Sequence, residues 1–236
     1  MDWFESDYYH ILYKNRDSRE AEILINNILD IIKLKKGSKV LDLACGNGRH
    51  SKYLEKLGYK VIGIDNSVNN IIKAKLNENM NLRFYNKEMT EYFGNEFDAV
   101  FNLFTSFGYE DEHHNIKTIK NIRDHLKING FAVIDYLNSM FIEKNLVKKE
   151  TKLINGINFH IERHTDINFI YKKISFHDKK DYVFNEKVMK LKQNDFENYF
   201  KKNNLTLLKS FGDYNLNEFD INKSERLIMI IKKSQP

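Results

Sequence analysis

Residues 40–48, Val-Leu-Asp-Leu-Ala-Cys-Gly-Asn-Gly, decide the fold of this chain. A run of mostly apolar residues leads into a turn bracketed by Gly46 and Gly48, and a helical pattern follows directly. This order predicts a buried parallel strand that delivers the chain to a tight loop before a helix. Because glycine has no Cβ, a ligand can approach such a loop closely, and the free N–H groups of the helix face that ligand.

A second strand with an acid at its end follows that helix. Residues 60–64 are mostly apolar and lead to Asp65, nineteen residues after Gly46 (65 − 46). An acid at this place in a βαβ unit can accept hydrogen bonds from a ribose diol. Ser51 stands where a dinucleotide fingerprint has its third glycine, which favours an adenosine carrying something smaller than a pyrophosphate. A glycine-rich structural turn with a solvated aspartate is the alternative.

The pattern Asp42-x-Ala-Cys-Gly46-x-Gly48, with Asp65 after the second strand, resembles motif I and its partner acid in class I S-adenosylmethionine (SAM)-dependent methyltransferases. The resemblance extends over most of the chain. It implies a Rossmann-like, doubly wound α/β sheet of seven strands in the order 3-2-1-4-5-7-6, with the last strand antiparallel. It also implies SAM as cofactor and S-adenosylhomocysteine as product. In that family the loop backbone holds the methionine part and the second-strand acid holds the ribose hydroxyls.

Two further segments complete the expected cofactor site. Glu88 and Met89, after the third strand, stand where the family often has an acid and an apolar residue at the adenine. The loop that begins at Asn102 follows a central parallel strand, so we expect it under the transferred methyl group. The expected cofactor-binding residues are Asp42, Ala44, Cys45, Gly46, Asn47, Gly48, Asp65, Asn66, Glu88, Met89, Asn102, Leu103 and Phe104.

Residues 102–109 also bear on the methyl acceptor. Methyltransferases of exocyclic base amino groups commonly carry Asn or Asp, then Pro-Pro, then an aromatic residue, whereas Asn102 is followed by Leu-Phe. The run Phe-x-Ser-x-Gly-Tyr at 104–109 instead resembles small bacterial small-molecule methyltransferases, including amino-sugar N-dimethylating enzymes. We therefore expect methyl transfer to an N or O nucleophile of a small molecule.

Two segments are expected to cover the site within one methyltransferase domain of residues 1–236. Residues 1–17 are rich in aromatic side chains, which suit a sulfonium cation, so the segment is either an N-terminal lid or surface packing. Residues 150–192 alternate apolar and polar side chains, which predicts an inserted antiparallel β meander of three strands. That meander is either a second lid or an oligomer-forming sheet. His160 and His164 are proton acceptors only if they face the cleft.

The predicted chemistry is an in-line displacement at a methyl group already activated by the sulfonium, so alignment and water exclusion matter most. A general base is needed only if the nucleophile arrives protonated. No residue is marked as that base, and the first candidates for mutation are Tyr9, His10, Tyr13 and Tyr109. No metal site is expected, because the adjacent His113 and His114 point in different directions from a helix start.

Three polar or aromatic positions near the expected site are less decided. Tyr136 and Asn138 follow the fifth strand and are placed to line the substrate side. Arg226 opens the last strand, and we expect it to pair with a surface acid rather than to reach the pocket.

Composition limits the remaining alternatives. The 236 residues are 42% hydrophobic, and the single cysteine excludes a disulfide within the chain. We expect a buried structural thiol at Cys45, a cytoplasmic protein without a signal peptide, and no membrane partner. The net charge of +5 is spread thinly, so nucleic acid is not expected as a partner. An RNA or protein methyltransferase, an NAD-dependent oxidoreductase and a SAM-binding protein without turnover stay open. So does the oligomeric state, a dimer included.

Overall fold

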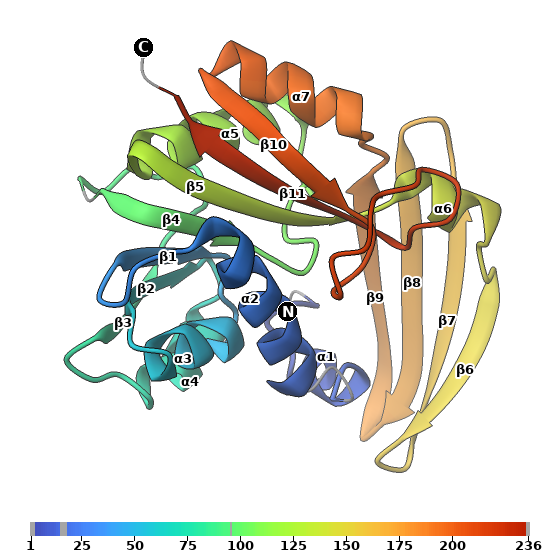
Figure 1. Ribbon diagram of the computed structural model, residues 1–236. Helices are drawn as coiled ribbons and strands as arrows, with labels where there is room; N and C mark the ends of the chain where they lie inside the picture. Colours follow the sequence, from blue (N-terminus) through green and yellow to red (C-terminus); the bar gives the residue numbers. More distant parts are fainter. Residues whose placement is uncertain (1–2, 15–17, 95, 235–236) are drawn as a thin grey trace.

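The main feature of the fold is a seven-stranded sheet with helices on both faces (Figure 1). The computed structural model describes residues 3–14, 18–94 and 96–234. The sheet has the order β10-β11-β5-β4-β1-β2-β3. Its strands are β1 (Lys39–Leu43), β2 (Lys60–Asp65), β3 (Leu82–Asn86), β4 (Phe97–Asn102), β5 (Leu126–Leu137), β10 (Leu205–Phe211) and β11 (Arg226–Lys233). Numbered along the chain, this is the predicted order 3-2-1-4-5-7-6, and β11 is antiparallel to both neighbours, as expected.

Neighbouring residues of the central strands are buried on opposite faces because helices cover both. On one face Val40 packs in a cluster with Ile28, and on the other Leu41 packs in a cluster with Ile122. The helices of the first face are α2 (Ser18–Ile32), α3 (Arg49–Lys56) and α4 (Val68–Lys75), and those of the second are α5 (Glu112–His125) and α7 (Gln193–Lys202). Burial on both sides explains why these strands read as continuous apolar runs.

A four-stranded antiparallel sheet is inserted between β5 and α7, after the short helix α6 (Ser139–Lys144). Its strands are β6 (Lys149–Ile154), β7 (Ile157–Thr165), β8 (Phe169–Asp178) and β9 (Lys180–Met189). The predicted meander is therefore confirmed, but it has four strands rather than three. The additional strand, β6, is the edge strand and has no fully buried side chain, so its sequence lacks a clear apolar alternation.

The N-terminal segment lies between the inserted sheet and the helices of the first face (Figure 1). Helix α1 (Asp7–Leu12) begins after Ser6, whose side chain accepts a hydrogen bond from the Tyr8 N–H. Trp3 packs on Phe184 of β9, with ring centroids 5.0 Å apart, while the main-chain carbonyl of Phe4 accepts a hydrogen bond from Asn70 of α4. Of the predicted lid, residues 1–2 and 15–17 lie outside the described part of the chain.

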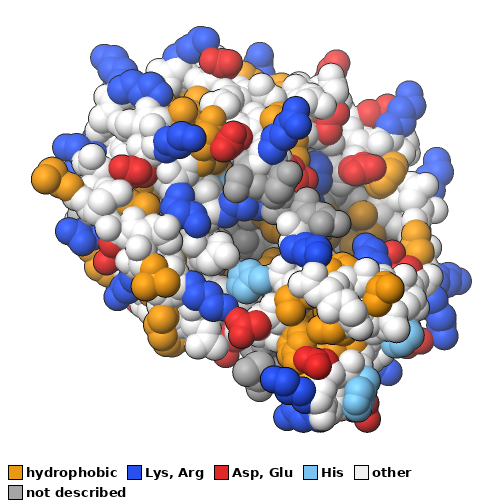
Figure 2. All heavy atoms as spheres, turned by 90° about the horizontal axis from the view of Figure 1, so that it is seen from below, with side chains coloured by type: hydrophobic (Ala, Val, Ile, Leu, Met, Phe, Trp, Pro, Cys, Tyr) orange, Lys and Arg blue, Asp and Glu red, His pale blue; other side chains and the backbone are white. Residues whose placement is uncertain are grey.

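The surface carries mixed charge on the face seen from below. Figure 2 shows Lys and Arg side chains spread among Asp and Glu, with no single basic patch on that face. Within the described ranges, none of the helices is long and apolar enough to cross a bilayer.

Candidate active site

A cavity of about 790 Å³ lies where the carboxyl ends of the central strands face the N-terminal segment and β9. Its size falls within the range of small-molecule and cofactor pockets. One wall comes from the loops that follow β1, β2, β3 and β4, and the other comes from residues around α1 and from β9. The cavity therefore joins the main sheet to the two segments that were expected to cover it.

The loop after β1 presents its backbone to this cavity. Gly46 has φ +56°, and a Cβ added there would meet no heavy atom within 4 Å. Gly48 has φ +81°, and a Cβ there would lie 2.5 Å from the Phe84 ring, so only glycine fits both the dihedral and the space. Helix α3 starts directly after Gly48. The loop thus combines an approachable backbone with a helix N-terminus, as the sequence predicted.

The Asp65 carboxylate ties the ends of β1 and β2 together. Its Oδ2 accepts a hydrogen bond from the Gly46 N–H (2.9 Å), and its Oδ1 accepts from the Ser67 N–H (2.9 Å) and the Asn70 amide (3.5 Å). Burial raises the pKa of Asp65 from its ordinary value. A carboxylate can accept about four hydrogen bonds, so Oδ2 keeps one free lone pair in a residue that lines the cavity.

Three of the thirteen expected cofactor residues do not line the cavity. Asp42 lies beneath the loop and accepts a hydrogen bond from the Ser51 hydroxyl (2.5 Å), and burial raises its pKa to about 6. Gly48 faces Phe84, and the Asn102 amide donates to the Leu43 carbonyl (3.0 Å). The ten that line the cavity are Ala44, Cys45, Gly46, Asn47, Asp65, Asn66, Glu88, Met89, Leu103 and Phe104.

The cavity wall near Cys45 and Met89 is fixed by packing and by one amide. Burial raises the pKa of the Cys45 thiol well above its ordinary value, which keeps it protonated, in keeping with a structural role. The Asn121 amide donates to the Met89 carbonyl (2.7 Å) and so fixes the backbone of the segment 88–89, which lines the cavity.

Tyr136 and Asn138 do not line the cavity, contrary to expectation, whereas Arg226 pairs with an acid and stays out of the cavity, as expected. Tyr136 is buried and donates its hydroxyl hydrogen to the Met189 carbonyl (2.5 Å), and Asn138 caps α6 and donates to nearby loop carbonyls. Arg226 pairs with Asp135, which is fully buried rather than at the surface. Other segments cover these residues: Phe107 and Phe196 pack on Tyr136, and the loop before β11 covers Asn138.

All four catalytic candidates line the cavity. His10 lies at the Asp65 end, where its Nε2 is 3.1 Å from the Asn70 amide oxygen, and burial lowers its pKa. Tyr9 and Tyr13 are adjacent, with centroids 4.9 Å apart, and burial raises the pKa of Tyr109 well above its ordinary value. Tyr109 is therefore not marked as a general base.

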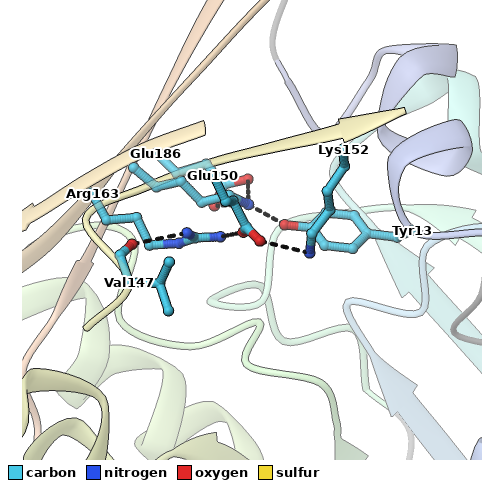
Figure 3. A network of polar contacts seen from close by, with 7 residues as sticks. Tyr13, Val147, Glu150, Lys152, Arg163 and Glu186 are labelled. Carbon is cyan, nitrogen blue, oxygen red and sulfur yellow. Dashed lines mark hydrogen bonds and ion pairs between the residues drawn. The ribbon is translucent and has the colours of Figure 1, made fainter. Parts of the chain in front are cut away.

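Sequence reasoning missed Glu186, which lines the cavity from β9. The Lys172 ammonium lies 3.3 and 3.4 Å from its two carboxylate oxygens and also donates to the Tyr13 hydroxyl. Figure 3 shows Tyr13 facing this charged row, which continues across the sheet to Arg163 and Glu150. No motif marks these residues, although the alternation Phe184-x-Glu186-x-Val188 places Glu186 on the inner face.

His50 was also missed. It lines the cavity, is only 7% exposed, and burial lowers its pKa to about 3. It is therefore neutral at physiological pH. His114 also lines the cavity, whereas His160 contacts Thr151 and the His164 ring stacks on Tyr171. Over the described residues, no three His, Cys, Asp or Glu side chains gather as metal ligands would.

Comparison with known proteins gives the family. Residues 40–130 match the family model of the methyltransferase domain. A probable S-adenosyl-L-methionine-dependent methyltransferase, TehB, of Haemophilus influenzae is 31% identical over 113 residues, which are 46% of this chain and 39% of that protein. Residues 40–130 are therefore similar to the methyltransferase domains of SAM-dependent enzymes. A glycine/sarcosine N-methyltransferase of Aphanothece halophytica is 30% identical over 155 residues, 62% of this chain and 57% of that one. The matches thus span roughly half the length of these relatives.

Solved structures share the whole methyltransferase fold. A SAM-dependent methyltransferase from Clostridium acetobutylicum has a TM-score of 0.82 at 19% identity, covering 97% of this chain and 96% of that one. The sugar N-methyltransferase KedS8 from Streptoalloteichus has a TM-score of 0.78 at 15% identity, covering 96% and 93%. SAM is the cofactor of this family, and the exposed Gly46 backbone and the free lone pair of Asp65 fit its methionine and ribose parts.

Proposed function

We propose that this methyltransferase transfers a methyl group from SAM to the nitrogen of a small-molecule amine. The observation that carries the proposal is the wall opposite the cofactor loop, where Glu186 lies among the tyrosines at 9, 13 and 109. A carboxylate and aromatic rings together stabilise the positive charge that a neutral amine acquires as it is methylated. The glycine/sarcosine and sugar N-methyltransferases among the similar proteins also act, by their names, on nitrogen.

The cofactor half of the cavity would hold SAM in one orientation. Asp65 would accept a ribose hydroxyl, the backbone at 44–47 would hold the methionine part, and the segment 88–89 would flank the adenine. Bound SAM supplies a methyl carbon already activated by its sulfonium. The loop 103–106 would then lie beneath that methyl group, since it follows β4 at the centre of the sheet.

The acceptor half would align the nucleophile and stabilise the charge that forms on it. The amine lone pair forms the new N–C bond while the C–S bond breaks, and its electrons leave with the sulfur of S-adenosylhomocysteine. Positive charge develops on nitrogen, and the carboxylate of Glu186 would stabilise it. The product ammonium then loses its proton to solvent, so a secondary or tertiary amine can form without a dedicated base.

The test is a panel of acceptors with labelled SAM. We expect methylation of small amines, amino sugars included, and none of the matched compounds in which a hydroxyl replaces the amine. Glu186→Gln should lower kcat/KM for the amine roughly tenfold or more, since a hydrogen bond to a charged group is lost. The matched control is Glu110→Gln, which changes an exposed glutamate of the same cavity.

Two results would contradict the amine proposal. Transfer to the hydroxyl compounds alone would assign an O nucleophile. Equal kinetics for the Glu186 and Glu110 variants would remove Glu186 from acceptor recognition. Because Glu186→Gln leaves Lys172 without its carboxylate, the double variant with Lys172→Gln is needed to show that the loss does not come from an unpaired ammonium.

A further inference from the structure

The turn after β4 is held in a conformation that its residues do not favour. Phe104 has φ +69° and Thr105 has φ +55°, two consecutive non-glycine residues in the left-handed region. A β-branched residue such as Thr105 is a clear outlier there. Such conformations persist only where the surroundings enforce them, and they concentrate at functional sites.

Asp135 and Arg226 supply that enforcement. The Asp135 carboxylate, fully buried, accepts a hydrogen bond from the Phe104 N–H (2.8 Å), and its main-chain carbonyl accepts from the Thr105 N–H (2.9 Å). Arg226 donates to Asp135 Oδ1 from Nε (2.8 Å) and Nη2 (2.6 Å), and Nη2 also donates to the Thr105 hydroxyl (2.8 Å). The turn is therefore held at both backbone N–H groups and at one side chain.

The side chains of Asp135 and Arg226 hydrogen-bond to the cavity wall through this turn. Asp135 lies on β5 and Arg226 on the adjacent strand β11, and neither lines the cavity. Phe104 and Thr105 do line it, and the Arg49 guanidinium lies 5.1 Å from the centroid of the Phe104 ring. Any change in the pair would therefore act on the reaction through the position of Phe104 and its neighbours.

We propose that Asp135 and Arg226 are positioning residues for methyl transfer. They keep the Phe104–Thr105 turn in its left-handed conformation and so fix the part of the cavity beneath the transferred methyl group. The inference rests on the proposed function, because it assigns the loop 103–106 to the methyl end of the site. The alternative is that the pair contributes to folding alone.

The first variant is Arg226→Lys, which keeps the charge but loses the planar fork that contacts Asp135 and Thr105 together. We expect kcat to fall roughly ten- to 100-fold from the misplaced turn, with the Kd for SAM changed less than about twofold. The matched control is Arg163→Lys, which alters an arginine–glutamate pair in the inserted sheet whose arginine side chain is as exposed as that of Arg226, 20% in both.

Two further measurements separate positioning from folding. Hydrogen exchange of the Phe104 and Thr105 amides should accelerate in Arg226→Lys and not in Arg163→Lys, while the Gly46 amide exchanges as in the unaltered protein. Thr105→Gly should restore part of the lost kcat when combined with Arg226→Lys, because glycine adopts positive φ without strain.

The proposal is overturned if Arg226→Lys lowers only the melting temperature and leaves kcat and both amides unchanged. It is also overturned if Thr105→Gly gives no recovery. Failure of the proposed function is distinguishable: the unaltered protein would then methylate no acceptor, while amide exchange would still report whether Arg226 holds the turn.

Discussion

Asp65 offers the sharpest test of the cofactor site, through Asp65→Asn. The carboxylate uses three of about four acceptor positions on Gly46, Ser67 and Asn70, and we expect the fourth to bind a ribose hydroxyl. Asparagine keeps a single oxygen. If that oxygen accepts from the Ser67 N–H, the new NH2 group faces the Gly46 N–H, and two hydrogen-bond donors then point at each other.

The magnitude follows from the charge that is lost. A hydrogen bond to a charged group contributes about 1.5–3 kcal/mol, so the affinity for SAM should fall roughly 10- to 150-fold. The unsatisfied donors at Gly46 should also lower the free energy of unfolding by about 1–3 kcal/mol. Ser67→Ala is the control, because it removes the cap of α4, at a cost of about 1 kcal/mol, while leaving the carboxylate in place.

Calorimetry with S-adenosylhomocysteine and its 2′- and 3′-deoxy analogues isolates the contact. The unaltered protein should bind at least one deoxy analogue more weakly than the parent compound, and Asp65→Asn should lose that preference. If Asp65→Asn discriminates between the parent and both analogues as well as the unaltered protein does, Asp65 does not bind the ribose. A loss of affinity in Ser67→Ala equal to that in Asp65→Asn would show that the effect is structural.

The other predictions concern the cavity's support. Gly48→Ala should lower the free energy of unfolding in urea by about 2–4 kcal/mol, because the new side chain is strained at positive φ and overlaps the Phe84 ring. The control is Gly94→Ala, where φ is +76° and the space is open, and it should cost only about 1 kcal/mol. Equal losses in the two variants would exclude the overlap. Burial lowers the pKa of His50 to about 3, so the stability that the neutral ring contributes is present above pH 6.5 and is lost as the pH falls below it. The free energy of unfolding of His50→Gln should therefore fall by roughly 2–3 kcal/mol less than that of the unaltered protein between pH 6.5 and 4.5. Burial raises the pKa of Asp42 to about 6, so the stability that its neutral form contributes is present below pH 3.8 and is lost as the pH rises through 6. Between pH 4 and 8, the free energy of unfolding of Asp42→Asn should therefore rise by about 2–3 kcal/mol relative to that of the unaltered protein. The absence of such a rise would refute the burial of the charge.

The main sheet and the cofactor wall could be predicted because their signals are local. Strands buried on both faces read as apolar runs, and the turn after the first strand has glycine at two positions of positive φ, Gly46 and Gly48. Asp65 follows its strand directly, so its place at the end of the sheet depends on no distant pairing.

The contacts of Glu186 and Arg226 could not be predicted in the same way. Glu186 meets Lys172 only because β8 and β9 pair in one register, with Lys172 directly opposite Glu186. Arg226 meets Asp135 because β11 returns beside β5 from the other end of the chain. A shift of one residue in either register would place the two side chains of each pair on opposite faces, and the residue that pairs with Glu186 or Arg226 cannot be identified from its own strand alone.

The two walls of the cavity also differ in their relation to known proteins. The family match spans residues 40–130, which include all ten expected cofactor residues that line the cavity. Tyr9, Tyr13 and Glu186, which form the acceptor wall with Tyr109, lie outside it. The acceptor wall is built on α1 and the inserted sheet, which contribute no strand to the main sheet. Changes at Tyr9, Tyr13 and Glu186 would leave the strands that position the cofactor loops in place, so we expect the identity of the acceptor to depend on these residues together with Tyr109.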